Sequence, residues 1–276
     1  MIIIQYSYLL LVAVYLYKTL VRSEVRVISD CHTKALRRGL SGRGKRVFAY
    51  LKKKSFECVD LCLIANEGQK ADALKYTDRI QVIPDPIPPM APQGKIKGRG
   101  HSVVFVCSFD DDEPVSEILD AAEALSRDRN VYITGRAAPS VRERVEPLPR
   151  VLLTGFVSEG EYNQLIGDAG CLVSCTTEEG CLQSSGYEAI AVETPFVTTD
   201  SRALRAYFRD AAVYVDNDSG SIRSGVHRAL ECGGDLRKRM RRLKRQREGE
   251  MNQAMNTLEA FIQNGCEPSA STAEPT

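Results

Sequence analysis

The sequence has almost no net charge of either sign, and this absence removes the first reason to expect a nucleic-acid partner. Its 37 basic and 36 acidic residues leave a formal charge of +1, so no field of one sign extends over the whole chain. The basic residues are nevertheless uneven, because the stretch Arg237–Arg247 reads RKRMRRLKRQR. We therefore predict no nucleic-acid partner, while the basic run needs an explanation of its own.

The spacing of a zinc site is also missing. The nine cysteines include no CxxC pair, and the three histidines lie away from paired cysteines, except for His32 beside Cys31. Several cysteines fall within apolar runs, where a reduced thiol behaves as a small hydrophobic side chain. We predict no metal site, buried free thiols and a cytoplasmic protein.

A long unbroken apolar run is missing as well, although the start of the chain comes close. No basic segment precedes it, as a signal peptide requires, and the polar stretch QYS interrupts it. The unbroken part, Tyr8–Tyr17, is short against the ~20 residues that span a membrane. We favour a buried strand at Ile2–Gln5 and an apolar helix from Leu9 to about Val21. A membrane anchor within residues 1–20 is the alternative.

Strands and helices alternate along the rest of the chain. The strands are apolar on both faces, which is typical of a parallel sheet that helices cover on both sides. We expect about four strands before residue 88 and about six after residue 102. Of the helices between them, one is predicted over Glu67–Asp78, and another follows Ser158, whose spacing from Glu161 is typical of a capping box. The predicted strands are Ile2–Gln5, Val25–Ser29, Leu61–Asn66, Arg79–Asp85, Ser102–Ser108, Asn130–Gly135, Val151–Phe156, Cys171–Thr177, Pro195–Asp200 and Ala212–Asp216.

Proline, glycine and lysine replace the apolar pattern between Pro84 and Gly100, a composition that is typical of a linker. We therefore predict an α/β fold with two Rossmann-like parallel-sheet domains. The N-terminal sheet is so small that the domain would be incomplete, or would lean on the second domain or on another chain. The predicted parts are a truncated domain at 1–88, a linker at 89–101, a second domain at 102–232, and a basic helix with a disordered tail at 233–276.

Small and polar residues crowd the turn that precedes the predicted helix Gln183–Val192. The turn joins the carboxyl end of a parallel strand to the start of a helix, which is where open α/β sheets bind ligands. Free backbone N–H groups there attract phosphate, Ser184 and Ser185 add hydroxyl groups, and Glu188 suits a ribose diol. A nucleotide site follows. Helix packing by the small residues, with a solvated glutamate, is the competing interpretation.

The same segment, VSCTTEEGCLQSSGYEAIAVETPFVTTDS, resembles the nucleotide-sugar site of the family 4 glycosyltransferases, whose GT-B fold has two Rossmann domains. Further segments match in the same order: FVCSFDDDEP, VYITGR, RVLLTGFVSEGEYNQLIGDAGCLV and RAYFRDAAVYVDND. The resemblance covers residues 103–231. It implies a retaining enzyme that moves a sugar from a nucleotide-diphosphate sugar to a glycan or lipid-linked acceptor, with no metal and no further cofactor.

The resemblance also implies roles for single residues. Glu188 matches the second of the family's paired glutamates, which binds the ribose of the donor. Phe156 and Val157 would hold the base, largely through backbone contacts. His32, in VRVISDCHTKALRRG, matches the family's active-site histidine and would face the donor sugar, unless it only packs or caps after the strand. The residues near the donor phosphates would be Gln183, Ser184, Ser185 and Gly186.

The sequence departs from the family at the diphosphate. Gly180 replaces the first glutamate of the pair, with Glu178 and Glu179 just upstream as substitutes. The arginine and lysine that follow the first strand in the family are replaced by the acidic stretch DDDEP. Arg136 is the nearest basic residue, and it either binds the donor or is a solvated loop arginine.

Rival functions remain at this level. The family's opening strand has no counterpart here, so the chain could be a non-catalytic donor-binding subunit or a decayed paralogue that needs a partner chain, or its gene could be truncated. A sugar-nucleotide epimerase shares the fold. Arg237–Arg247, with Leu236, Met240 and Leu243 at helical spacing, suits an anionic membrane surface and peripheral attachment at the inner face. A solvated helix that returns towards the first domain is the alternative.

Overall fold

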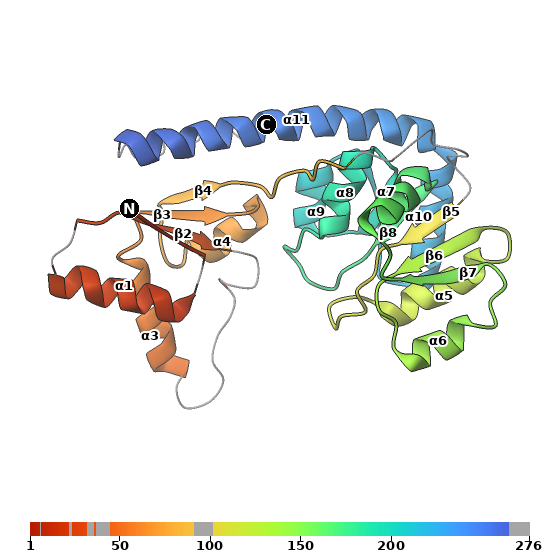
Figure 1. Cartoon of the computed structure of the whole chain (residues 1–276), viewed down its shortest axis with the longest axis horizontal. Coiled ribbons are helices and arrows are strands. Elements are labelled where there is room, and N and C mark those ends of the chain that lie inside the picture. The colour runs from red at the N-terminus through yellow and green to blue at the C-terminus, as the bar shows by residue number, and fades with distance from the viewer. Residues whose placement is uncertain (6, 22–23, 32–35, 37–44, 91–101, 265–276) are drawn as a thin grey trace. The chain divides into compact units, whose positions relative to one another are not determined.

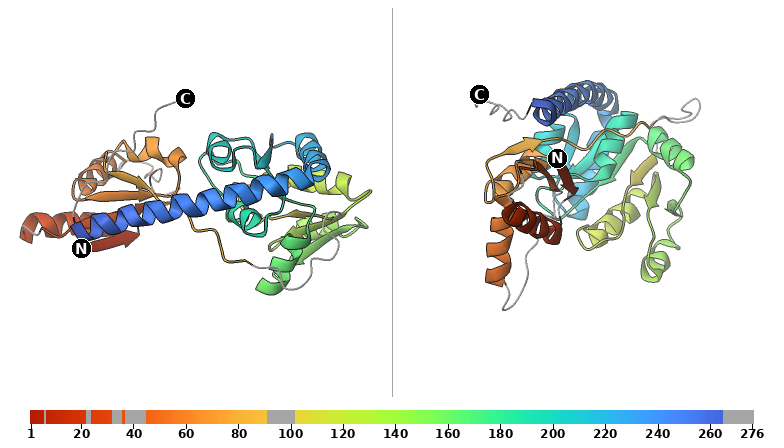
Figure 2. Two further views of the ribbon diagram at one scale, coloured as in Figure 1. Left: turned by 90° about the horizontal axis from the view of Figure 1, so that it is seen from above. Right: turned by 60° about the vertical axis from the view of Figure 1, so that its left-hand side comes forward.

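The computed structural model of the chain divides into two compact units. The first unit comprises Met1–Asp85 and the chain from Gly249, and the second comprises Pro86–Glu248. The helix α11 (Gly233–Asn264) contributes to both units and is unbroken, as Figure 2 shows. The structure describes residues 1–5, 7–21, 24–31, 36, 45–90 and 102–264.

The first unit is built on a four-stranded parallel sheet with the strand order β1-β2-β3-β4 (Figure 1). The strand β1 (Ile2–Gln5) and the helix α1 (Tyr8–Val21) confirm the strand and helix predicted at the start of the chain, although only Ile4 of this strand is buried. Among the described residues, no helix is long and apolar enough to cross a membrane. The other strands are β2 (Val27–Cys31), β3 (Leu61–Ile64) and β4 (Ile80–Val82).

Helices cover both faces of this sheet. The helices α1 and α3 (Lys45–Phe56) lie on one face, and the C-terminal half of α11 lies on the other (Figure 1). Neighbouring residues of β2 therefore enter different clusters, since Val27 packs with Leu11 of α1 and Ile28 packs with Phe261 of α11. A 3-10 turn, Glu67–Gln69, leads into the single-turn helix α4 (Lys70–Ala73), where one longer helix was predicted.

The second unit is built on a six-stranded sheet with the order β10-β9-β8-β5-β6-β7, and all of its strand pairs are parallel. The chain fills one side of β5 with β6 and β7, and then the other side with β8, β9 and β10. The order thus reverses between β5 and β8, and such a switch point is where ligands bind. The strands are β5 (Ser102–Phe105), β6 (Asn130–Thr134), β7 (Val151–Gly155), β8 (Cys171–Ser174), β9 (Phe196–Thr199) and β10 (Ala212–Val215).

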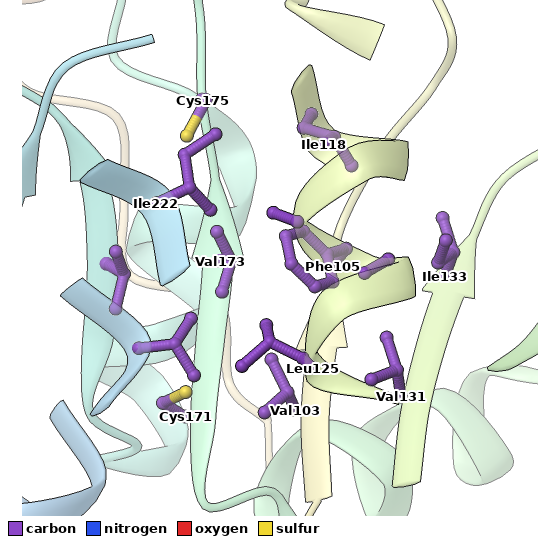
Figure 3. Packing of buried hydrophobic residues seen from close by; sticks show 14 of the residues in the cluster. Val103, Phe105, Ile118, Leu125, Val131, Ile133, Cys171, Val173, Cys175 and Ile222 are labelled. Carbon is purple, nitrogen blue, oxygen red and sulfur yellow. The ribbon is translucent and has the colours of Figure 1, made fainter. Parts of the chain in front are cut away.

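Alternate residues of β5 point to two cores, as expected for a strand that is buried on both faces. Val103 and Phe105 pack against the helices α5 (Val115–Leu125) and α10 (Ser219–Glu231), as Figure 3 shows for part of this cluster. Val104 packs on the other side with residues of α7, α8, α9 and α11. The remaining helices are α6 (Pro139–Val145), α7 (Glu159–Asp168), α8 (Ser184–Val192) and α9 (Arg202–Phe208).

The basic run at the start of α11 packs and hydrogen-bonds against the second unit. Its apolar residues face the cores, since Leu236, Met240 and Leu243 are at most 4% exposed. Several of its basic side chains donate to carbonyl oxygens at the ends of neighbouring helices, where partial negative charge collects. These bonds favour the alternative of a helix that packs against the protein, and the lipid-binding interpretation of this run stays a prediction. These bonds include Arg237 to Ala169 (2.9 Å), Lys244 to Ala191 (2.9 Å) and Arg247 to Ala206 (3.2 Å).

The predicted fold class is confirmed, because both units are α/β with purely parallel sheets of four and six strands. Most of the predicted linker, from residue 91, and the predicted tail, from residue 265, lie outside the described residues. The residues just before, Ile87 and Met90, pack against the second unit's core. The described cysteines are free thiols, and most of them are buried.

Candidate functional site

Two loops meet at the switch point of the second sheet, one after β5 and one after β8. The carbonyl oxygen of Asp112 accepts hydrogen bonds from the backbone of Thr177 (2.8 Å) and from the hydroxyl groups of Thr176 and Thr177 (3.2 Å each). Asn217 bonds the carbonyl oxygen of Thr176 (2.9 Å) and so ties the loop after β10 to the same edge. The carboxyl ends of the central strands therefore form one connected framework.

The start of α8 carries polar groups that lack partners. Gln183 precedes the helix without capping it through its side chain. Its amide donates to the carbonyl oxygen of Cys175 (3.1 Å), but its Oε1 atom is buried and unpaired. The hydroxyl group of Ser185, whose residue is 3% exposed, is likewise unpaired among the described residues. Buried polar groups are normally satisfied, and a helix start favours an anion, so the hydroxyl group of Ser185 could donate to an acceptor-rich ligand. Oε1 of Gln183 could only accept from a donor group of a ligand.

Gly186 has a packing role. A Cβ atom at this position would lie 2.5 Å from Phe208 and 3.4 Å from Phe196, so only glycine lets α8 approach these rings. Its N–H group already donates to the carbonyl oxygen of Gln183 (3.0 Å). The packing interpretation therefore accounts for Gly186, while Ser184 is exposed at the first position of the helix.

Glu188 lies between α7 and α8 and is held there by Tyr162. The phenol of Tyr162 donates to Oε2 of Glu188 at 2.5 Å. Burial raises the pKa of the Glu188 carboxyl, and the hydrogen bond from Tyr162 partly offsets this by lowering it. Burial and the neighbouring carboxylate raise the pKa of Tyr162, so its phenol stays protonated. The second oxygen of Glu188 makes no hydrogen bond with the described residues, which leaves an oriented acceptor for a ligand hydroxyl.

The loop that would hold the base exposes an aromatic side chain. Phe156 is 83% exposed and Val157 is 37% exposed. Ser158 follows at once and begins α7 with the predicted capping box, in which Ser158 and Glu161 satisfy each other's backbone N–H groups. The capping box fixes the path of the chain between this loop and Tyr162, one turn into α7.

The backbone N–H groups after β5 donate to a carboxylate of the protein itself. Glu113 accepts from the N–H groups of Ser108 (2.9 Å) and Phe109 (2.7 Å) and from the thiol of Cys107 (3.0 Å). Phe109 has a positive φ of 64°, which helps both amides converge on one anion. Burial, more than the Glu113 carboxylate, raises the pKa of Cys107, so its thiol remains a donor. These amides are therefore not available to a phosphate.

Arg136 follows β6 and is exposed, and it has no ion pair or hydrogen bond among the described residues. The preceding Gly135 has a φ of 93°, and a Cβ atom there would lie 2.0 Å from the carbonyl oxygen of Cys107. Glycine thus brings the loop with Arg136 against the loop after β5. This guanidinium is a free cation beside the switch point, whereas the loop after β5 itself is acidic.

The upstream glutamates differ in their availability. Glu179 accepts from the backbone N–H of Arg202 at 3.1 Å and so caps the start of α9. Glu178 is exposed and its carboxylate has no partner among the described residues, so it is the better substitute for the glutamate that Gly180 replaces. His32 lies outside the described residues. Within the described part of the chain, no group of His, Cys, Asp and Glu could hold a metal ion.

Two residues of this region were missed in the sequence. Tyr162 gives only a weak signal, an aromatic residue four positions after the Ser158 cap, because its partner comes from another helix. Glu113 was noted as part of an acidic stretch, but its hydrogen bonds to Ser108 and Phe109 depend on the loop's backbone conformation.

Comparison with known proteins finds a family match for the second unit. Residues 100–231 match the family model of the group 1 glycosyl transferases. The match covers a little less than half of the chain, so this segment is similar to the group 1 glycosyltransferases. It contains the whole switch-point framework and all predicted donor-site residues except His32, and a search of curated protein sequences found no match.

Solved structures extend the likeness in fold to both units. HepE from Anabaena, in complex with UDP, has a TM-score of 0.73 at 12% identity, over 92% of this chain and 77% of HepE. A glycosyltransferase from Rickettsia africae has a TM-score of 0.69 at 14% identity, over 91% and 74% of the two chains. Sucrose-phosphate synthase from Thermosynechococcus elongatus has a TM-score of 0.68 at 12% identity, over 91% and 71%.

Proposed function

We propose that the chain is a retaining glycosyltransferase that binds a nucleotide-diphosphate sugar at the start of α8. The observation that carries the proposal is the Tyr162–Glu188 pair. A half-buried carboxylate with a raised pKa costs stability, and its free oxygen is oriented by a neutral phenol. Such an acceptor suits the two vicinal hydroxyl groups of a ribose.

The diphosphate would lie at the turn into α8. The unpaired hydroxyl group of Ser185 and the helix dipole favour negative charge there. The loop after β5 is acidic and supplies no cation. Its backbone N–H groups are also unavailable to the diphosphate, because they already donate to Glu113. Arg136 has no hydrogen bond or ion pair with the described residues and lies beside this edge of the sheet, so we assign it to the diphosphate. Phe156 would cover the base.

Transfer breaks the bond between the anomeric carbon and the diphosphate oxygen. The acceptor hydroxyl group forms the new bond on the same face of the sugar, and its proton goes to the departing diphosphate. Charge that develops on the leaving group would be stabilised by the start of α8 and by Arg136. We keep His32 as the residue that faces the donor sugar, and a glycan or a lipid-linked glycan as the acceptor.

A second function, a donor-binding subunit without its own catalysis, is favoured by the acidic stretch. Glu113 accepts the hydrogen bonds of the backbone N–H groups after β5, which are then not available to a phosphate. Gly180 supplies no carboxylate. Such a subunit would bind a nucleotide sugar but transfer nothing unless a partner chain completed the first domain.

Turnover separates the two functions. HepE was solved with UDP and with UDP-glucose, so uridine nucleotides are the first donors to test. We expect one UDP- or GDP-sugar to be consumed slowly by hydrolysis and faster with a glycan acceptor, with the product showing the donor's anomeric configuration by NMR. His32→Ala should keep donor binding and lose transfer. Donor binding without any turnover would favour the subunit, and inverted product would contradict retention.

A further inference from the structure

The helix α1 presents its apolar side chains outwards. Leu9, Leu16 and Leu20, spaced so that they share one helical face, are 75%, 50% and 80% exposed. The opposite face buries Leu11 completely. Surface helices of globular proteins normally turn apolar residues to the core and polar residues to water, so this leucine stripe is an unusual surface.

The single charge of α1 points the other way. Lys18 donates to Asp60 Oδ2 and to the carbonyl oxygen of Cys58, both at 3.3 Å. Asp60 also accepts from the backbone N–H of Val27 at 2.7 Å. The lysine thus fastens α1 to the sheet, and nothing charged remains among the outward leucines. The orientation of α1 is consequently fixed by a polar contact as well as by Leu11.

The neighbouring helix α3 adds positive charge to the same side of the sheet. It packs against α1 (Figure 1), and neither helix contains an acidic residue. Arg46 and Lys53 are exposed and have no ion pair among the described residues, and they flank Tyr50, which is 62% exposed. Lys54 pairs with Glu57 just beyond the helix, at 2.8 Å. Exposed leucines and uncompensated cations therefore lie on adjacent helices.

We propose that this α1–α3 face docks on an anionic phospholipid bilayer, with Leu9, Leu16 and Leu20 in the interface and Arg46 and Lys53 at the headgroups. Both components match the requirements of an in-plane membrane helix, which are apolar burial and attraction to anionic lipid. A protein partner fits less well, because the cores of protein interfaces are depleted in lysine. The surface is distinct from the basic run of α11, where several side chains bond to acceptors of the second unit.

Vesicle flotation tests the proposal on the full chain. Vesicles of phosphatidylcholine with phosphatidylglycerol should bind the protein, vesicles of phosphatidylcholine alone should bind it less, and salt should weaken the difference. The variant Leu9→Ser/Leu16→Ser/Leu20→Ser should lose about tenfold or more in affinity. Arg46→Ser and Lys53→Ser should each lose about fivefold on anionic vesicles only.

Matched controls come from the same unit. Leu74 is an exposed leucine next to α4, and Lys70 is an exposed lysine of α4. Leu74→Ser and Lys70→Ser should leave vesicle binding unchanged. Circular dichroism should show that all variants fold, since the changed side chains are exposed, and Leu20→Ser alone replaces the triple variant if that one does not fold.

Two results would overturn the proposal. One is equal binding of the wild type and the triple variant to anionic vesicles, or no binding by either. The other is self-association of the wild type in sedimentation velocity that the triple variant abolishes while vesicle binding persists, because the leucines would then serve a second copy of the chain.

Discussion

The surfaces proposed for the two units differ in the groups that lack a partner. The second unit covers its apolar helix faces, including that of α11, but keeps unpaired polar atoms at Ser185 and Gln183 and an oriented carboxylate oxygen at Glu188. The first unit pairs the lysine of α1 but exposes the leucines of that helix. What each unit lacks indicates its partner: a polar ligand for the second and an apolar, anionic surface for the first.

The same substitution in both units gives the sharpest contrast. Leu243→Ser, in α11, removes a side chain that is 4% exposed in the core of the second unit and should cost about 2–5 kcal/mol of unfolding free energy. Leu20→Ser, in α1, should change this free energy by less than about 0.5 kcal/mol. Urea denaturation measures both. A loss of similar size at Leu20 would mean that the leucine stripe is part of a core.

Donor binding at the Tyr162–Glu188 pair should respond to the loss of a single hydroxyl group. Tyr162→Phe removes the hydrogen bond that lowers the pKa of Glu188, so the carboxyl should ionise at a higher pH. The acid limb of donor binding should therefore move to higher pH, and affinity at neutral pH should fall by about threefold to tenfold. Calorimetric titration of UDP across pH measures this shift. An unmoved pH profile would separate Tyr162 from the site.

The sequence predicted the elements that depend on hydrophobic period and on capping residues close together in the chain. The strand and helix at the start of the chain, the capping box at Ser158 and the helix after Gln183 follow from hydrophobic period and capping chemistry, and the structure contains all three. The helix α6 was missed because PSVRERV is short and charged. The helix expected from Glu67 breaks into a 3-10 turn and a single helical turn.

The remaining features depend on residues that are distant in the sequence. The basic run of α11 matched a lipid surface by composition, but its acceptors are carbonyl oxygens such as those of Ala169 and Ala191, which the fold brings into reach. The Tyr162–Glu188 pair joins residues 26 positions apart on two helices. The role of Gly186 depends on Phe208, which reaches it only through packing.

The central claim is that Glu188 binds the donor's ribose, and calorimetric titration of UDP into the wild type and Glu188→Gln tests it most directly. Glutamine keeps an acceptor for Tyr162 but loses the charge, so UDP affinity should fall by about tenfold to a hundredfold, whereas Glu123→Gln on the exposed side of α5 should bind normally. The pKa of Glu188 is higher in the folded protein than in the unfolded chain. Protonated Glu188 therefore favours the folded state below the unfolded chain's pKa, and this stabilisation is lost as pH rises through the folded protein's pKa. Glu188→Gln should therefore be at least as stable as the wild type at neutral pH. Unchanged UDP affinity in a folded Glu188→Gln variant would contradict the account.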